Sequence, residues 1–120
     1  MEFQDSKAIF KQIADRLCMQ IMTGEYADNE RVPSVRDCSA ELEVNINTAL
    51  RGYEKLQRAN IIYLKRGMGY YVTPGAGDKI REMLRTSFFE KEIVELHNTI
   101  TRLGITPDEL AERLRAIQSE

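Results

Sequence analysis

The chain has 120 residues, of which 42% are hydrophobic and 30% charged, and its formal net charge at pH 7 is −2. This length and composition are typical of a globular protein with one domain, or one small domain and an appendage. No apolar run approaches the ~18 residues of a membrane span, and the polar first six residues are no secretory signal. With two cysteines and one histidine, the sequence has no disulfide framework, metal-ligand cluster or catalytic grouping. We therefore expect a cytoplasmic protein without cofactor or enzymatic activity.

Charge is distributed unevenly along the chain. Residues 1–43 carry five basic and nine acidic groups, a net of −4, whereas residues 44–70 carry five basic groups and one acidic group, a net of +4. Such a local excess of positive charge favours contact with the phosphates of a nucleic acid. A solvated charged surface is the alternative explanation, so the charge supports this interpretation without establishing it.

Three helices are predicted in the first half of the chain. Apolar residues at three-to-four spacing predict an amphipathic helix over residues 6–23. Ser34 has the side chain of an N-cap and begins a second helix. After a turn at residues 43–44, Asn45 caps a third helix that runs to about Ala59.

The third helix has an apolar face and a polar N-terminal end. Its inward stripe consists of Ala49, Gly52, Tyr53 and Leu56, whereas Asn47, Thr48, Leu50 and Arg51 remain near the exposed end. In a helix-turn-helix, this end of the second helix of the motif touches the base edges of DNA. Asparagine pairs with adenine, threonine with phosphate or a thymine methyl group, and arginine with guanine or phosphate. The position of these residue types, rather than their identity alone, indicates a recognition helix.

Two short β-prone runs, residues 61–64 and 70–73, follow the third helix and are joined around residues 67–69. The glycines of this turn permit positive φ, and Lys65 and Arg66 lie at its tip. Helix, turn, helix and hairpin follow one another in the order of a winged helix-turn-helix. We expect the wing to lie on a phosphate backbone or to reach into the minor groove of DNA.

Arg36, near the start of the second helix, lies off its apolar face and is free to reach a backbone phosphate. A surface salt bridge with Glu41 or Asp37 is the alternative role. The predicted DNA-contacting residues are Ser34, Arg36, Asn45, Ile46, Asn47, Thr48, Arg51, Lys65, Arg66, Gly67 and Met68.

A short linker, residues 74–77, precedes two further predicted helices. The first spans about residues 78–103, with apolar residues at the alternating spacing of a helix–helix seam, and the second opens at Thr106-Pro107. So few residues cannot bury both apolar faces among themselves. They must pack on the winged helix or, more economically, on a second subunit. The predicted dimer interface comprises Ile80, Leu84, Phe88, Phe89, Ile93, Leu96, Ile100, Leu103, Leu110 and Leu114.

The expected fold is mainly α with a small β-hairpin. Residues 1–75 are predicted to form a winged helix-turn-helix DNA-binding domain and residues 76–120 a two-helix C-terminal dimerisation tail. The expected partners are double-stranded DNA and a second copy of the chain. Association with a membrane is not expected.

Four segments match a known pattern in the same order and with the same gaps. They are IFKQIA at residues 9–14, VPSVRDC at 32–38, VNINTALRGYEKL at 44–56 and KRGMGYYV at 65–72. Over roughly the first 73 residues the chain thereby resembles the GntR family of bacterial transcription regulators. The resemblance implies a homodimer on a palindromic operator, with Arg36 and Thr48 on DNA and Gly67 at the wing tip in the minor groove.

One residue departs from the family pattern. The family usually has arginine, a common base contact, where this chain has Ile46. Helical spacing permits Ile46 to face either the core or DNA, where it offers only apolar contact, as to a thymine methyl group. We therefore expect an operator preference unlike the usual one of the family, or weaker binding.

The short tail resembles that of the small YtrA-type subfamily, whose members often regulate transporter operons. The resemblance implies a sequence-specific regulator, expected to be a repressor, without the large effector-binding domain of other family members. Whether a small-molecule effector binds at the dimer interface stays open. The alternative function is a protein-interaction module that uses the winged helix as a scaffold, with little or no DNA binding.

Overall fold

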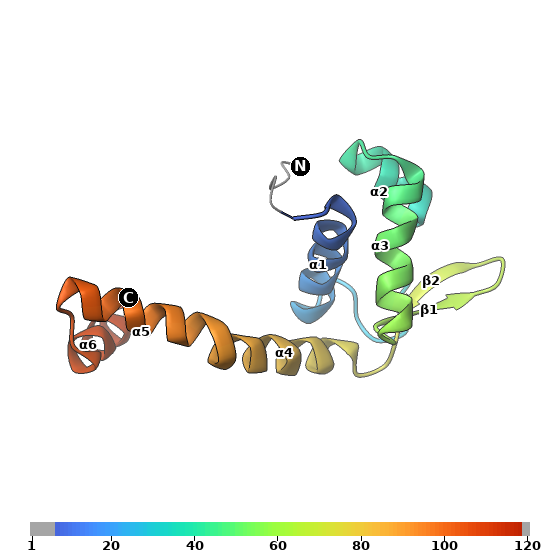
Figure 1. Cartoon of the computed structure of the whole chain (residues 1–120). Helices are drawn as coiled ribbons and strands as arrows, with labels where there is room; N and C mark the ends of the chain where they lie inside the picture. The colour runs from blue at the N-terminus through green and yellow to red at the C-terminus, as the bar shows by residue number, and fades with distance from the viewer. Residues whose placement is uncertain (1–6, 119–120) are drawn as a thin grey trace. The chain divides into compact units, whose positions relative to one another are not determined.

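The computed structural model describes residues 7–118. The chain divides into two compact units, Met1–Glu82 and Met83–Glu120. The elements are α1 (Ile9–Met22), α2 (Val35–Leu42), α3 (Ile46–Arg58), β1 (Ile62–Lys65), β2 (Gly69–Val72), α4 (Ala76–Ser87), a π-helical segment (Phe88–Glu92), α5 (Ile93–Leu103) and α6 (Pro107–Gln118) (Figure 1). The mainly α fold with a small β-hairpin is confirmed. Within the described residues, no helix has both the length and the apolar character that crossing a membrane requires.

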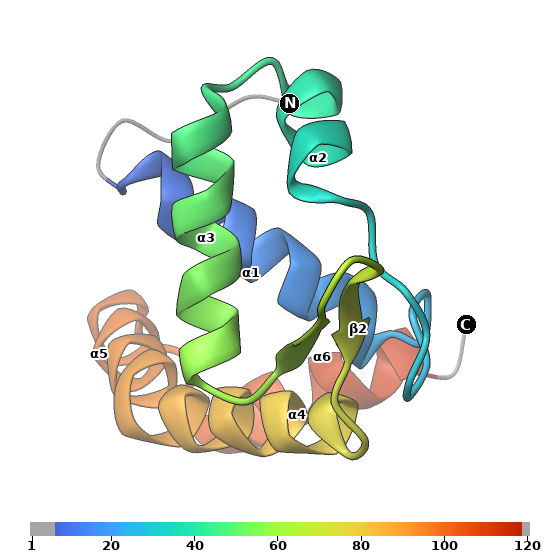
Figure 2. The same cartoon turned by 90° about the vertical axis from the view of Figure 1, so that its right-hand side faces the viewer.

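The core of the first unit lies where α1, α2 and α3 bury the faces that the apolar spacing predicts (Figure 2). The predicted inward stripe of α3 is buried along its whole length. Gly52 lies where α3 meets α1, and a Cβ atom there would be only 2.9 Å from the carbonyl oxygen of Phe10. Glycine is therefore required for the close approach of these two helices.

Side-chain caps fix the starts of the second and third helices, as predicted. The Ser34 hydroxyl accepts a hydrogen bond from the Asp37 amide at 3.0 Å, and the Asn45 side-chain oxygen accepts one from the Asn47 amide at 2.7 Å. Between the two helices Glu43 adopts a left-handed conformation with φ 55°. This residue reverses the chain and orients α3 relative to α2.

The two strands form an antiparallel hairpin in which Ile62 pairs with Val72 and Lys65 with Gly69. Each observed strand is displaced by one residue toward the turn from its predicted run. The base of the hairpin is buried, and the segment before α2 pairs with it, since the Val32 amide donates to the Tyr70 carbonyl at 3.0 Å. The wing is thus held at its base by the core, and its outer half is exposed.

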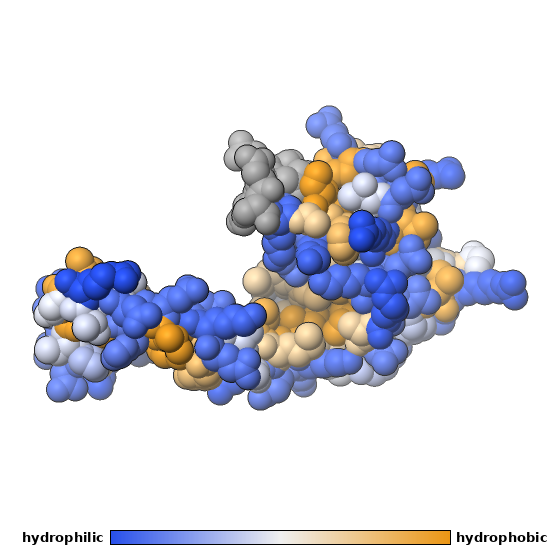
Figure 3. Space-filling model, in the orientation of Figure 1, coloured by the Kyte–Doolittle hydropathy of each residue, from blue (hydrophilic) through white to orange (hydrophobic). Residues whose placement is uncertain are grey.

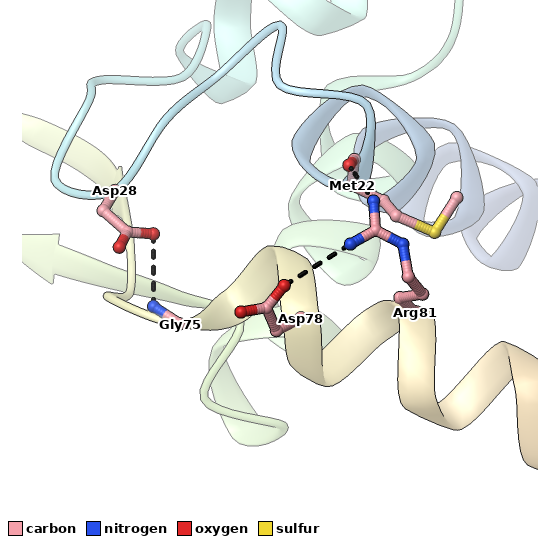
Figure 4. Close-up of polar contacts among 5 residues, drawn as sticks. All are labelled: Met22, Asp28, Gly75, Asp78 and Arg81. Carbon is pink, nitrogen blue, oxygen red and sulfur yellow. Dashed lines mark hydrogen bonds and ion pairs between the residues drawn. The ribbon is translucent and has the colours of Figure 1, made fainter.

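The start of α4 belongs to the first unit. The helix begins at Ala76, within the predicted linker, and Ala76 and Ile80 are buried in the core beside α1. Arg81 donates to the Met22 carbonyl at 3.2 Å and to Asp78 at 3.4 Å (Figure 4). In the same view the Gly75 amide donates to Asp28 at 3.1 Å.

These contacts correct one predicted interface residue. Ile80 was expected at a dimer interface, but only 3% of its surface is exposed, so its side chain is not available to a second subunit. The four-residue spacing that links it to Leu84 is equally compatible with burial in the chain's own core.

In the second unit, the predicted continuous helix over residues 78–103 is interrupted by the π-helical segment Phe88–Glu92. A π turn contains one residue more than an α turn. The apolar stripe of the sequence shifts by one position at the same place: its first part ends at Phe88 and its second part begins at Phe89. The extra residue of the π turn compensates for this shift and brings the two parts closer to one face of the helix. Gly104 ends α5 at φ 71°, and the Thr106 hydroxyl caps α6 by accepting from the Glu109 amide at 3.1 Å.

Candidate nucleic-acid interface

The N-terminal half of α3 presents a mixed polar and apolar surface on the side away from the core. Asn47 and Arg51, one turn apart, are exposed there, and Thr48 is half-buried. Beside them lie Ile46 and Leu50, with 45% and 37% of their surface exposed. Ile46 therefore faces outward, which decides between the two orientations that its spacing allowed.

The Arg51 guanidinium lies over the ring of Phe10, with its carbon 4.0 Å from the ring centroid. A hollow between the start of α1 and α3 is lined by Ala8, Ile9, Phe10, Asn47, Thr48 and Arg51. The cation–π contact holds the guanidinium on the α1 side of the recognition helix, where it retains donors for a phosphate.

The first turn of α2 brings two predicted residues beside this helix. The Ser34 hydroxyl is half-buried and engaged in its cap, so what remains for a ligand is its other lone pair and its proton. Arg36 is exposed, and none of the ion pairs found among residues 7–118 includes it. Its alternative partner Glu41 pairs instead with Arg16 at 3.2 Å.

The wing is stiffened by aromatic contacts below its tip. The rings of Tyr63 and Tyr71 stack with centroids 5.9 Å apart, and the Lys65 ammonium lies 4.7 Å from the centroid of Tyr71. At the tip the Met68 amide donates to the Lys65 carbonyl at 2.9 Å, and Gly67 adopts φ 77°, a conformation that favours glycine. The residues at the tip are exposed, as the wing prediction requires: Lys65, Arg66, Gly67 and Met68.

The sequence interpretation missed two residues at this surface as candidate DNA contacts. The Arg31 guanidinium packs against Gly69 of the hairpin. A Cβ atom added at Gly69 would lie 3.1 Å from the Arg31 Nε. Arg31 belongs to the acidic N-terminal segment of the sequence, so only the pairing of this segment with β2 reveals its position. Leu50 is exposed on α3 and lies one turn from Ile46, and this spacing is the signal in the sequence that identifies it.

The two cysteines, the half-buried Cys18 and the buried Cys38, have weakly reactive thiols. Burial, with a smaller contribution from Asp15, raises the pKa of the Cys18 thiol to about 11, and burial also raises the pKa of Cys38. Both thiols are therefore protonated near neutral pH and are poor nucleophiles. Among the described residues, no three histidine, cysteine or acidic side chains come together in a way that suits a metal ion.

In the second unit most large apolar side chains are exposed, and Figure 3 shows a few apolar patches on an otherwise hydrophilic face of this unit. Phe88 and Phe89 form an edge-to-face pair with centroids 5.3 Å apart and are 42% and 60% exposed. An apolar groove of about 240 Å³ runs between α5 and α6, lined by Ile93, Leu96, His97, Ile100, Pro107, Leu110, Ala111 and Leu114. Of the predicted interface residues in this unit, Ile100 is buried between the helices and offers little surface to a partner.

A family match agrees with this arrangement of recognition helix, wing and short helical tail. Residues 9–72 match the family described as bacterial regulatory proteins, gntR family. The chain belongs to this family. It is therefore a transcriptional regulator with a DNA-binding helix-turn-helix, and not an enzyme. Both the GntR assignment and its YtrA-type character are confirmed.

Relatives extend the match over nearly the whole chain. The uncharacterized HTH-type transcriptional regulator YhcF of Bacillus subtilis is 29% identical over 95% of this chain and 93% of its own length. The HTH-type transcriptional repressor YtrA of the same organism is 25% identical over 98% of this chain and 89% of its own. A GntR family transcriptional regulator from Listeria monocytogenes superimposes with a TM-score of 0.80 at 32% identity, covering 95% of this chain and 98% of the other.

Proposed function

We propose that this GntR regulator is a repressor that binds a palindromic operator as a homodimer in the cytoplasm. The observation that carries the proposal is the exposed N-terminal half of α3, set beside Arg36 and the basic wing in one compact unit. The name of the similar YtrA protein, a transcriptional repressor, supports the sign of regulation.

The polar groups of this surface divide into two classes of DNA contact. Arg36, Lys65 and Arg66 are long, exposed cations at the edges of the surface and suit phosphates, which fix orientation without reading sequence. Asn47 and Thr48 lie on the recognition helix between them and suit base edges in the major groove.

The second unit supports the homodimer. Its exposed side chains include Leu84, Phe89 and Leu114, which are 48%, 60% and 55% exposed. Apolar surface of this extent on so few residues marks an interaction site. Two copies related by a twofold axis would present two recognition helices, which fits an operator with matching half-sites.

The experiment that tests the proposal is a fluorescence-anisotropy titration of the full chain on the promoter DNA of its own operon, against scrambled DNA, at two salt concentrations. We expect tighter binding to the promoter and a steep loss of affinity with salt, because phosphate contacts release counterions. Sedimentation equilibrium on the same sample gives the oligomeric state.

Two test variants and one control variant accompany the titration. Arg36→Ala and Thr48→Ala are expected to weaken promoter binding with the fold retained, and Arg36→Ala also to reduce the salt dependence by about one phosphate contact. The matched control is Arg113→Ala, which removes an exposed arginine from α6. Unchanged binding in both test variants, or no binding of the parent protein even at low salt, contradicts the proposal and favours the protein-interaction module.

A further inference from the structure

Two aliphatic side chains lie exposed on the recognition helix. Ile46 begins α3 and Leu50 follows four residues later, so both lie on one flank of the helix within its first turns. They are 45% and 37% exposed, whereas the apolar residues of the opposite face are buried. The flank is therefore not part of the core, and its apolar character needs another explanation.

The neighbouring polar side chains indicate which base pair this flank of α3 would contact. Asn47, between the two aliphatic residues in sequence, has an exposed amide that matches the paired donor and acceptor of adenine in the major groove. Arg51, the first cation of the helix, has its guanidinium over Phe10 on the α1 side. The entering end of α3 thus offers two aliphatic side chains beside the Asn47 amide and the half-buried Thr48, and its first cation lies toward α1.

We infer that Ile46 and Leu50 are specificity-determining residues that contact the C5-methyl groups of thymine. The methyl group of thymine is the apolar feature of the major-groove edge, and it accompanies the adenine that an asparagine recognises. The half-site accordingly carries A·T pairs where α3 enters the groove. This inference rests on the proposed function, because it takes α3 as the helix that reads the operator.

The test uses a change in DNA that removes only the methyl group. The full chain first selects its half-site from a pool of random double-stranded DNA, and each thymine of the selected site is then replaced by uracil. At one or two positions we expect about a fourfold loss of affinity, the effect of burying roughly one CH₂ group. Uracil substitution outside these positions leaves the affinity unchanged.

Protein variants assign each methyl group to a side chain. Ile46→Ala and Leu50→Ala are each expected to bind the thymine site more weakly and to lose the response to uracil at one position, because the methyl group no longer has a partner. Ile46→Val, which keeps a branched side chain, retains part of the response. Met19→Ala, a change of an equally exposed residue on α1, binds with the parent affinity and keeps the full response.

The outcomes separate this inference from the proposed function. A selected site to which the parent protein binds equally well with thymine or uracil overturns the inference and leaves the proposed function intact. Equal responses to uracil in the parent and in both alanine variants overturn it as well. A pool from which no sequence is enriched contradicts sequence-specific binding itself, and with it the inference.

Discussion

The two compact units differ in where their apolar side chains lie. Among the described residues, every buried hydrophobic residue belongs to the first unit except Ile100. In the second unit most large apolar side chains are exposed: Met83, Leu84, Phe88, Phe89, Val94, Leu103, Leu114 and Ile117. The first unit therefore has a core of its own, and its exposed groups are available for DNA. The second has too little core to be stable alone, which favours folding against a partner.

The largest expected effect comes from the core of the first unit. Tyr53 is 2% exposed, packs edge-to-face on Tyr70 at 5.3 Å and donates to the Pro33 carbonyl at 2.7 Å. Replacing a buried aromatic residue by alanine costs roughly 3–5 kcal/mol, so we expect Tyr53→Ala to lower the free energy of unfolding of the first unit by about that amount. Denaturant unfolding measures it.

Tyr53→Phe is the matched control for this change. It keeps the ring and removes the hydrogen bond to Pro33, so its expected cost is only about 1 kcal/mol, the net value of one such bond. Equal effects of the two variants would show that the ring does not stabilise the core.

The second expected effect concerns association. Phe89 is 60% exposed in the single chain and its ring contacts Phe88 of the same segment, so its replacement leaves the packing of the first unit intact. If the second unit dimerises through its apolar surface, Phe89→Asp weakens the dimer by at least about 100-fold, since the dimer buries two phenylalanines and each contributes roughly 1.5–3 kcal/mol. Sedimentation equilibrium measures the dissociation constant.

Glu90→Ala is the control, because it changes an adjacent exposed residue without altering apolar surface. An unchanged dissociation constant for Phe89→Asp would place the interface elsewhere. Loss of stability in the first unit would contradict the division into two units.

The difference between the units also predicts a response to alkali. The groups whose pKa is raised by burial, Cys18, Cys38 and Tyr53 among them, lie in the first unit. For Cys18 the pKa rises from 9.0 to about 11. Between these values the unfolded chain loses the thiol proton while the folded chain keeps it, so the unfolded state binds fewer protons and stability falls as pH rises.

We therefore expect the free energy of unfolding to be maintained below about pH 9 and to decline between about pH 9 and 11. Cys18→Ala makes that decline shallower, which denaturant unfolding at three pH values measures. Identical slopes for the two proteins would mean that the thiol is not protected in the folded chain.

Features encoded by neighbouring residues could be predicted from the sequence. The caps Ser34 and Asn45 and the apolar stripe of α3 involve residues within a few positions of one another, and their predicted structure is confirmed. The strand limits were each displaced by one residue, because pairing between Ile62 and Val72 sets them, and not the β propensity of either run.

Features that depend on distant contacts could not be predicted. The spacing of Ile80 is the same whether it packs on its own chain or on another, and only the tertiary structure shows that it lies in the core of the first unit. Arg31 reaches the wing through strand-like pairing 40 residues along the chain, between Arg31 and Tyr71. The orientation of Ile46 likewise required the position of the core relative to α3.

The smallest expected effects compare a helix cap in each unit. Ser34 caps α2 at 3.0 Å and Thr106 caps α6 at 3.1 Å, so the two bonds are locally equivalent. Replacing such a cap by alanine typically costs about 1 kcal/mol. Ser34→Ala should lower the free energy of unfolding of the first unit by this amount at any protein concentration. Thr106→Ala should act through the second unit instead, as a roughly 30-fold weaker dimer, because each dimer loses two caps.

Denaturant unfolding and sedimentation equilibrium of both variants distinguish these effects. A Thr106→Ala protein with normal dimerisation and a destabilised first unit would mean that the tail stabilises the core directly. The exposed apolar surface of the second unit would then not be what requires a second copy. If Thr106→Ala changes only the dissociation constant of the dimer, the stability of α6 depends on association. This dependence is expected for a unit with one buried apolar residue among those described.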